Sequence, residues 1–575
     1  MTSRQEILET LRKQPEISVL IVGGGVNGIG TFRDLALQGI DVLLVDKADF
    51  ASGASAASSH MLHGGLRYLE NAEFRLVREA LHERNRMLIN APHYAKPLPT
   101  TIPIFSWFSG FLNAPLKFLN LRDKPSERGA IIIEIGLRLY DWFTRDSRVM
   151  PTHRLIGRKE SLDLRPQLNH DIVCTAQYYD AWMPYPERIC MEMVMDTEAM
   201  SPKARALNYV AMDSASGDTV TLRDELSGET FTVKPKVVIN AAGPWIDFAN
   251  RSIGKETHFI GGTKGSHILV DHHELHQATL GNEMFFENKD GRITLFFPLM
   301  DKVLIGTTDI RVDDPEQTIC TAEEVDYMLD LVNQVFPNIK LDRSHIVFKF
   351  SGVRPLPSTE TSTTGQISRD HSIRVTEPDQ QIQFPVLSLI GGKWTTFRAF
   401  SEQVTDKVLA RFNIARKADT KQMSIGGGKN YPRTEAEQKA WVAALAQETG
   451  LAEEHIHILF ERYGTYARQV AGFMADGEDS MLQNHHSYSR REIEFLALHE
   501  KVIHLEDLIL RRSLMAMLGE VTGALLVELA DVVGLVLGWS DGQKHAEIAR
   551  TTLLLSTKHG VSAEKLNVSQ AVTNS

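Results

Sequence analysis

The chain has 575 residues, of which 43% are hydrophobic and 23% charged, and its formal net charge at pH 7 is −11. This length allows about two to four domains with substantial cores, and the acidic balance argues against nucleic acid as a main partner. The chain has only three cysteines, and they form neither a CxxC pair nor a pattern with the spacing of zinc ligands. We therefore expect no disulfide scaffold, no metal site and a reducing compartment.

The N-terminal segment, residues 1–16, is polar and carries three glutamates, which argues against a signal peptide or a transit peptide. Ser3 and Glu6 have the spacing of a capping box and predict a short leading helix. The most apolar stretch, 523–539, is interrupted by two acidic residues and predicts a buried helix. Since no uninterrupted apolar span is long enough to cross a bilayer, any membrane contact should be peripheral.

The next segment predicts a βαβ unit. An apolar strand at 18–22 leads into a glycine turn at 23–28, and a helix follows at 29–38. A second strand at 42–45 ends at Asp46. This order of elements is the frame in which dinucleotides bind at the end of the first strand.

The glycine turn has the form G-x-G-x-x-G, with Gly23, Gly25 and Gly28. The first glycine permits the tight turn, the second lets the backbone approach a pyrophosphate, and the third lets helix and strand pack closely. The helix N-terminus offers N–H groups and the positive end of its dipole to the phosphates. Asp46 stands where a carboxylate accepts the ribose hydroxyls. We therefore predict a nucleotide cofactor.

A second glycine turn distinguishes FAD from NAD. Gly391, Gly392 and Lys393 follow a predicted strand at 387–390, and a helix begins near Thr395. A large cofactor held by both ends of a domain fits FAD better than NAD, and no second G-x-G-x-x-G after a strand is evident for a separate NAD site.

Further elements define the domain organisation. A helix is predicted near 71–90, and strands at 237–240, 293–297 and 303–305, whereas helical periodicity dominates from about residue 431. The expected organisation is a FAD-binding domain over 1–400, interleaved with a substrate region at roughly 75–230 and 255–350, a linker at 401–430, a helical domain at 431–560 and a tail at 561–575.

The stretch 55–70, SAASSHMLHGGLRYLE, resembles the FAD-dependent glycerol-3-phosphate dehydrogenases, which are quinone-reducing flavoenzymes. Matching motifs follow in the same order: NAAGPW (240–245), KGSH (264–267), IGTTD (305–309), SGVRPL (351–356), ISRD (367–370) and GGKWTTFR (391–398), then Tyr463-Gly464, His499-Glu500 and Leu510–Arg512. The resemblance covers nearly the whole chain. It implies an α/β (α+β) Rossmann-type FAD domain of the glycine-oxidase-like fold, a mixed β-rich substrate domain and a helical C-terminal domain.

The resemblance also assigns cofactor contacts. It places Ser55, Ser58 and Ser59 along the FAD diphosphate and under the flavin, whereas composition alone is as compatible with a flexible loop. Family members often have threonine where this chain has Ala54 and lysine where it has His60. The resemblance also assigns Gly243 and Thr395 to the cofactor site. It adds Gly391 and Gly392, and the N–H groups of these two glycines would stabilise the reduced flavin.

For the substrate, the resemblance implies a phosphate-binding set of Arg67, Arg354, Arg369 and Lys393, with His63 and Tyr68 at the reacting end. An arginine suits phosphate because its planar fork binds two oxygens at once. In the implied mechanism His63, or a water or neighbour that it orients, removes the hydroxyl proton. Arg354 stabilises the alkoxide, and a hydride passes to flavin N5. His267 is a second candidate for the base.

The implied reaction converts sn-glycerol 3-phosphate into dihydroxyacetone phosphate and passes electrons to a membrane quinone. The enzyme would then be cytoplasmic and peripheral on the inner face of the membrane. The sequence is also compatible with a homodimer.

The substrate has an alternative. Within YYDAWMPYPERI (178–189), Asp180 and Arg188 match the family, but residues 185–187 depart from it, so a longer substrate such as an erythritol phosphate is the alternative. Three other functions are alternatives to this reaction: an oxidase that uses oxygen, an amine or amino-acid oxidase, and a non-enzymatic FAD-binding protein that acts on RNA.

The membrane contact has a candidate in residues 105–120, FSWFSGFLNAPLKFLN. Aromatic side chains lie there beside basic residues, as an interfacial segment requires, and Gly110 and Pro115 break any long helix. The alternative is a loop that packs on the core or covers the active site.

Overall fold

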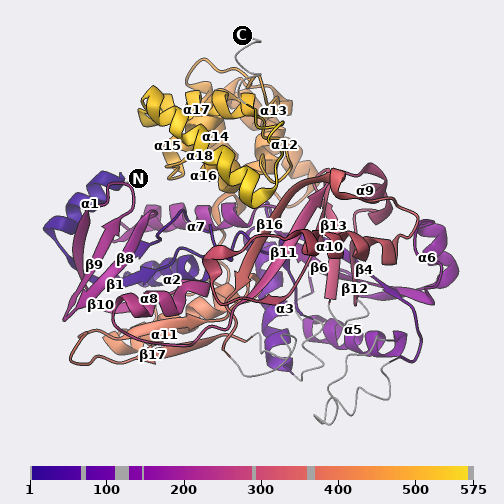
Figure 1. Cartoon of the computed structure of the whole chain (residues 1–575), viewed down its shortest axis with the longest axis horizontal. Helices are drawn as coiled ribbons and strands as arrows, with labels where there is room; N and C mark the ends of the chain where they lie inside the picture. The colour runs from indigo at the N-terminus through magenta and orange to yellow at the C-terminus, as the bar shows by residue number, and fades with distance from the viewer. Residues whose placement is uncertain are drawn as a thin grey trace.

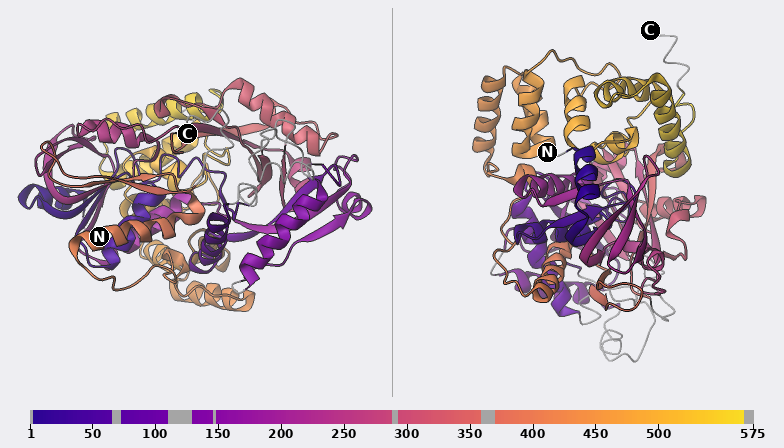
Figure 2. Two further views of the ribbon diagram at one scale, coloured as in Figure 1. Left: turned by 90° about the horizontal axis from the view of Figure 1, so that it is seen from below. Right: turned by 90° about the vertical axis from the view of Figure 1, so that its left-hand side faces the viewer.

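A computed structural model describes residues 3–65, 73–109, 129–145, 148–287, 293–358 and 370–567 (Figure 1). Two large sheets lie side by side, and a helical C-terminal domain covers one end of both (Figure 2). This arrangement confirms the expected fold class. Among the described helices, none combines the length and the apolarity that a bilayer crossing requires.

The first sheet contains the predicted βαβ unit. Its strand order is β17-β18-β10-β1-β2-β7, with β8 and β9 attached to β10 as an antiparallel extension. The strands are β1 (Glu16–Val22), β2 (Val42–Val45), β7 (Ala204–Leu207), β8 (Val210–Ser216), β9 (Thr219–Asp224), β10 (Thr230–Asn240), β17 (Ser372–Thr376) and β18 (Val386–Ile390). Because β1, β2, β10 and β18 pair in parallel, their carboxyl ends meet at one edge.

Helices cover this sheet on both faces, as a buried parallel sheet requires. On one face α2 (Val26–Leu37), α7 (Pro186–Met200) and α11 (Phe397–Phe412) share a single core with the strands. On the other face α1 (Arg4–Lys13) packs on the β8–β9 extension. The predicted capping box of α1 is confirmed, because the Ser3 side chain accepts from the Glu6 N–H.

The second sheet has the order β15-β11-β14-β13-β12-β4-β6-β3, with β16 paired to β11 and β5 to β6. Its strands are β3 (Met61–Leu62), β4 (Lys96–Ile104), β5 (Arg154–Gly157), β6 (Cys174–Trp182), β11 (Thr263–Val270), β12 (Glu283–Glu287), β13 (Ile293–Leu299), β14 (Lys302–Gly306), β15 (Ile310–Arg311) and β16 (Ile346–Arg354). Its flanking helices are α3 (Phe74–Asn90), α5 (Ala130–Thr144), α6 (Arg158–Leu164), α9 (His273–Thr279) and α10 (Ala322–Val335).

The C-terminal domain is helical, as predicted. It contains α12 (Glu435–Thr449), α13 (Glu453–Tyr463), α14 (Ala467–Ala475), α15 (Arg490–His499), α16 (Leu505–Asp507), a π-helical turn (Leu508–Arg512), α17 (Gly523–Leu537) and α18 (Asp541–His559). Its core continues into the second sheet through Phe348 and Phe350 of β16. The apolar stretch predicted as a buried helix is α17, whose buried side chains face this core.

Some boundaries differ from the sequence prediction. The helix predicted to begin at residue 29 begins at Val26, because the last residues of the glycine turn already have helical geometry. The strand predicted at 237–240 is the end of β10, whose earlier residues alternate between buried and exposed as they pair with β9. In addition, α11 reaches Phe412 and so enters the expected linker, and β7–β9 join the first sheet although they fall within the expected substrate region.

Candidate functional site

A cavity of about 1420 Å³ begins at the carboxyl ends of the parallel strands and extends to the face of β16. Open α/β sheets bind their ligands at this edge. Ligand pockets usually measure about 300–1,000 Å³, so this cavity can hold a large cofactor together with a small substrate. Expected site residues that line it are Gly23, Gly25, Asp46, Ser55, Ser58, Ser59, His63, Gly243, Arg354, Gly391, Gly392, Lys393 and Thr395.

The glycine turn brings α2 against the strand ends. Gly23 has a φ of +110°, and a side-chain carbon there would lie 2.5 Å from the carbonyl oxygen of Ala241. A side-chain carbon at Gly28 would lie only 2.0 Å from the carbonyl oxygen of Gly23, so helix and turn pack backbone against backbone. Gly25 is the N-cap of α2 and carries no side chain between the helix N-terminus and the cavity. This geometry suits a pyrophosphate.

Asp46 lies at the end of β2 and on the cavity wall. Its carboxylate accepts from the backbone N–H groups of Gly24 at 2.6 Å and Ala48 at 2.9 Å. Burial raises the pKa of Asp46 to about 6, although both N–H donors act in the opposite direction. The carboxylate is therefore held in place beside the glycine turn, where a ribose hydroxyl would bind.

The serine segment is anchored in the structure. The Ser55 hydroxyl accepts from the Val26 N–H at 2.9 Å, and the Ser55 carbonyl accepts from the Trp394 indole at 2.9 Å. A hydroxyl that accepts one bond can still donate another, for example to a phosphate. Further along, Ser59 Oγ lies 2.8 Å from His267 Nε2. Ser58 makes a local contact, accepting from the His60 N–H.

The second glycine turn forms the opposite end of the cofactor site. Gly391 and Gly392 have φ angles of +74° and +94°, and both approach neighbouring groups too closely for a side chain. Thr395 Oγ1 donates to the carbonyl of His63 at 3.2 Å, so this turn and the serine segment are fixed to each other. Lys393 lines the cavity between them.

Two unsatisfied polar atoms test whether the site fits FAD. Asn27 Oδ1 and Trp245 Nε1 are buried without a hydrogen-bond partner among the described residues, and both side chains belong to residues on the cavity wall. Buried polar groups are normally paired, so these two atoms point to a polar ligand. Together with the glycine turns and Asp46, they fit a dinucleotide that spans the cavity.

Arg354 lies at the end of β16, facing the cavity. Its guanidinium donates to Thr307 Oγ1 at 3.0 Å, to the carbonyl of Thr308 at 3.2 Å and to Asp309 Oδ1 at 3.3 Å. These acceptors fix the plane of the guanidinium at the cavity wall. The motif IGTTD supplies all three, but its residue pattern alone assigns them no role.

Three histidines stand near the same end. His63 lines the cavity. The pKa of His267 is lowered well below its usual value by burial and by the charge of Arg354, so its imidazole is neutral at pH 7. From the resemblance a lysine is expected at the position of His60, and burial lowers the pKa of this histidine to about 4. His60 therefore does not replace the missing positive charge.

A cluster of buried polar side chains binds the backbone next to His63. Asp180 accepts from the Tyr140 hydroxyl at 2.6 Å, from Arg84 at 2.8 Å and from the Gly64 N–H at 3.2 Å. The sequence singled out Asp180 but could not reveal Arg84 and Tyr140, which come from different helices. Arg188, which was grouped with Asp180, lies elsewhere: it makes two bonds to Glu500, at 2.8 and 2.9 Å, in the C-terminal domain.

Several predicted residues cannot be placed. Arg67, Tyr68 and Arg369 lie outside the described residues, as do residues 110–120 of the predicted membrane segment. Of the expected phosphate-binding set, Arg354 and Lys393 are thus the members that the structure brings to the cavity.

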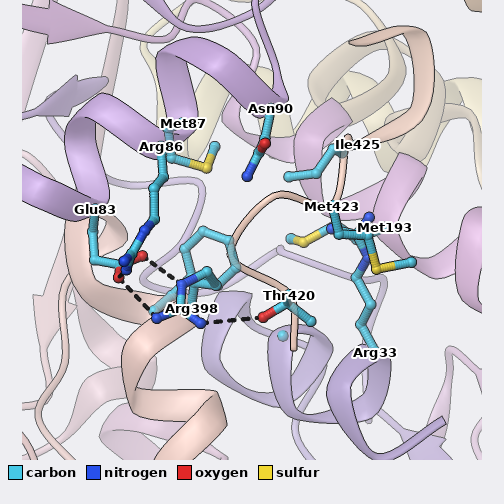
Figure 3. A pocket seen from close by; sticks show the side chains of 12 residues that line it. Arg33, Glu83, Arg86, Met87, Asn90, Met193, Arg398, Thr420, Met423 and Ile425 are labelled. Atoms are coloured by element: carbon cyan, nitrogen blue, oxygen red, sulfur yellow. Dashed lines mark hydrogen bonds and ion pairs between the residues drawn. The ribbon is translucent and has the colours of Figure 1, made fainter. Parts of the chain in front are cut away.

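A second, much smaller cavity lies behind α2 and measures about 20 Å³ (Figure 3). Arg398 crosses one side of it and binds both carboxylate oxygens of Glu83, at 2.7 and 2.8 Å. This volume accommodates about one water molecule. The ion pair joins α11 to α3, so it supports the turn that carries Gly391 and Thr395 rather than forming a ligand site.

Comparison with known proteins gives consistent matches. The family model described as FAD dependent oxidoreductase matches residues 18–376, and the one described as C-terminal domain of alpha-glycerophosphate oxidase matches residues 418–544. The chain is 38% identical to a glycerol-3-phosphate dehydrogenase of Synechocystis over 73% of this chain and 76% of that protein. It is 28% identical to a probable mitochondrial glycerol-3-phosphate dehydrogenase of Dictyostelium discoideum over 94% and 84% of the two chains.

Solved structures share the fold. The glycerol-3-phosphate dehydrogenase from Bacillus halodurans, complexed with FAD, matches with a TM-score of 0.72 at 22% identity, over 99% of both chains. The L-α-glycerophosphate oxidase from Mycoplasma pneumoniae, with FAD bound, matches with a TM-score of 0.52 at 19% identity, over 71% of this chain and 98% of that one.

Proposed function

Because the chain belongs to the FAD-dependent oxidoreductase family, and within it groups with the glycerol-3-phosphate dehydrogenases, we propose that it oxidises sn-glycerol 3-phosphate to dihydroxyacetone phosphate. We further propose that the electrons pass to a membrane quinone. The observation that carries the proposal is one cavity that joins the dinucleotide turn to Arg354 and His63. The same chemistry on a longer polyol phosphate is the alternative substrate.

The phosphate requires a local cationic site, since the chain as a whole carries a net charge of −11. Arg354 and Lys393 supply it in the described part of the cavity, and Arg67 and Arg369 complete the proposed set. Charge-assisted bonds from a fixed guanidinium to a phosphate are strong and directional. This recognition would distinguish a phosphorylated polyol from a free one.

The oxidation removes a proton from the hydroxyl and a hydrogen with two electrons from the carbinol carbon. We assign the hydroxyl proton to His63, directly or through a water that it orients, with Tyr68 proposed beside it. Arg354 stabilises the negative charge that develops on the oxygen. FAD, when bound, supplies the acceptor for the hydrogen and the two electrons. His267 is the alternative base, because its imidazole is neutral at pH 7.

An anaerobic spectral titration tests the substrate and the acceptor in sequence. Glycerol 3-phosphate should bleach the flavin absorbance, erythritol phosphates should do so less readily, and unphosphorylated polyols should leave it unchanged. A soluble quinone analogue should then restore the colour faster than air does. If no phosphorylated polyol bleaches the flavin, the proposed substrate class is wrong. If air restores it as fast, the protein is an oxidase, as the name of the matched C-terminal domain suggests.

Arg354→Ala should weaken the use of the phosphorylated substrate by about 2–5 kcal/mol in kcat/KM, the cost of removing one partner of a desolvated charge pair. Arg223→Ala is the matched control, because Arg223 lines the same cavity on β9, away from the proposed reacting end. The control should keep its kcat/KM once it is saturated with FAD. A wild-type kcat/KM of Arg354→Ala for glycerol 3-phosphate would show that Arg354 has no role in recognising this substrate.

His63→Asn should lower the rate of flavin reduction by about 10²-fold or more, since asparagine keeps a polar contact but cannot accept the proton. The absorbance spectrum of the bound flavin should stay unchanged. His267→Asn provides the comparison within the same cavity. A larger loss for His267→Asn than for His63→Asn would transfer the role of base to His267.

We also propose a peripheral contact with the inner face of the cell membrane through residues 105–120. Phe105, Trp107 and Phe108, at the described end of this segment, are 37%, 48% and 71% exposed. Aromatic side chains in such a position suit the boundary between headgroups and acyl chains. Their exposure supports the interfacial interpretation over packing on the core.

Trp107→Ser combined with Phe108→Ser should release the protein from vesicles of anionic lipid, because the double change removes apolar area from the interface. Leu535→Ser with Leu553→Ser is the control, since these exposed leucines lie on α17 and α18 of the C-terminal domain. Co-sedimentation with vesicles and the rate of flavin reduction in solution are measured for both. Release by the control pair alone would move the membrane contact to the C-terminal domain.

A further inference from the structure

The C-terminal domain reaches the cofactor cavity, although the chemistry proposed above gives it no part. Glu506, Leu510 and Arg511 line the cavity together with Asp46 and Val210. Asp46 marks the position at which the ribose of the adenosine half binds in a Rossmann fold. Through Glu506, Leu510 and Arg511 the C-terminal domain therefore reaches the adenosine half of the cofactor site, and its Lys558 and His559 line the cavity beside β16.

The first connection is a buried carboxylate held by two arginines. Asp49 follows Asp46 by three residues, and its carboxylate accepts from Arg511 Nε at 2.6 Å and from Arg512 at 2.7 and 3.0 Å. All three side chains are buried. Although burial alone would raise it, the two guanidinium charges hold the pKa of Asp49 below its usual range. A charge-assisted, bidentate contact of this kind fixes distance and orientation together.

The second connection runs through Tyr209. Its backbone N–H donates to the carbonyl of Ala48 at 2.9 Å, and the next N–H, of Val210, donates to the carbonyl of Asp46 at 2.7 Å. Its hydroxyl donates to Asp507 in the C-terminal domain at 2.6 Å. Tyr209 has a φ of +55°, a left-handed conformation that a bulky residue keeps only where its surroundings hold it.

From these contacts we propose that the C-terminal domain positions the adenosine half of the FAD site, with Asp49 and Tyr209 as positioning residues. Neither residue needs to touch the cofactor. Both fix the backbone from Asp46 to Asp49, so that the Asp46 carboxylate is in place before the ribose arrives and less conformational freedom is lost on binding. The proposal rests on the FAD assignment and is independent of the substrate and of the electron acceptor.

Tyr209→Phe tests the proposal on the full-length holoprotein, because it removes one hydroxyl and leaves the ring. Loss of a hydrogen bond to a charged group should speed the release of FAD about tenfold, measured on dilution by the fluorescence of the freed flavin. Tyr463→Phe is the matched control. Tyr463 is also buried and donates to Glu492 at 2.6 Å, but this bond lies within the C-terminal domain and does not reach the segment that carries Asp46.

Both variants should lose a similar amount of thermal stability, and only Tyr209→Phe should lose FAD faster. Asp49→Asn should also speed the release of FAD, and if this variant does not fold, Tyr209→Phe decides alone. Release of FAD at the wild-type rate from Tyr209→Phe would overturn the proposal. Equally accelerated release from Tyr209→Phe and Tyr463→Phe would also overturn it, because the domain would then add only general stability.

Discussion

The close contact of α2 with the turn before it, at Gly23 and Gly28, is the constraint from which the rest of the site follows. With no side chain between helix and turn, the N-terminus of α2 lies at the cavity, at the edge of the parallel sheet. Every other cofactor residue is placed relative to this point. Ser55 binds the first turn of α2, and Asp46 binds the glycine turn itself.

The segment from Ser55 to His63 links the two sheets and thereby connects the proposed cofactor site to the proposed reacting end. It is attached to α2 and Trp394 at one end, and to His267 and Thr395 at the other. The electrostatic character changes along it. A carboxylate with a raised pKa stands at the ribose end, whereas neutral histidines and a fixed guanidinium stand at the other. An acidic protein can in this way keep a small cationic site for an anion.

The sequence predicted the parts of this site that depend on local pattern. The strand predicted at 42–45 has the same bounds as β2, and both predicted glycine turns line the cavity. These features could be predicted because glycine spacing and flanking apolar runs are local signals. Contacts between distant residues left no such signal. Arg84 and Tyr140 meet at Asp180 only through the fold, and Arg188 was grouped with Asp180 by the resemblance although it faces the C-terminal domain. The start of β10 was missed because Lys234, Pro235 and Lys236 separate it from the apolar run at its end, and proline is unusual inside a strand.

The position of β1 in the first sheet has a consequence for how the protein is made. The strand lies between β2 and β10, and β10 pairs in turn with β18. During synthesis, β1 therefore cannot pair with β10 until many later residues have been made. At about 5–20 residues per second, a ribosome needs on the order of 20–70 s to travel from β1 to the end of β18. During that interval the sheet has an open edge, which is a hazard for aggregation. A cofactor site that needs both glycine turns is therefore complete only after Gly392 has been synthesised.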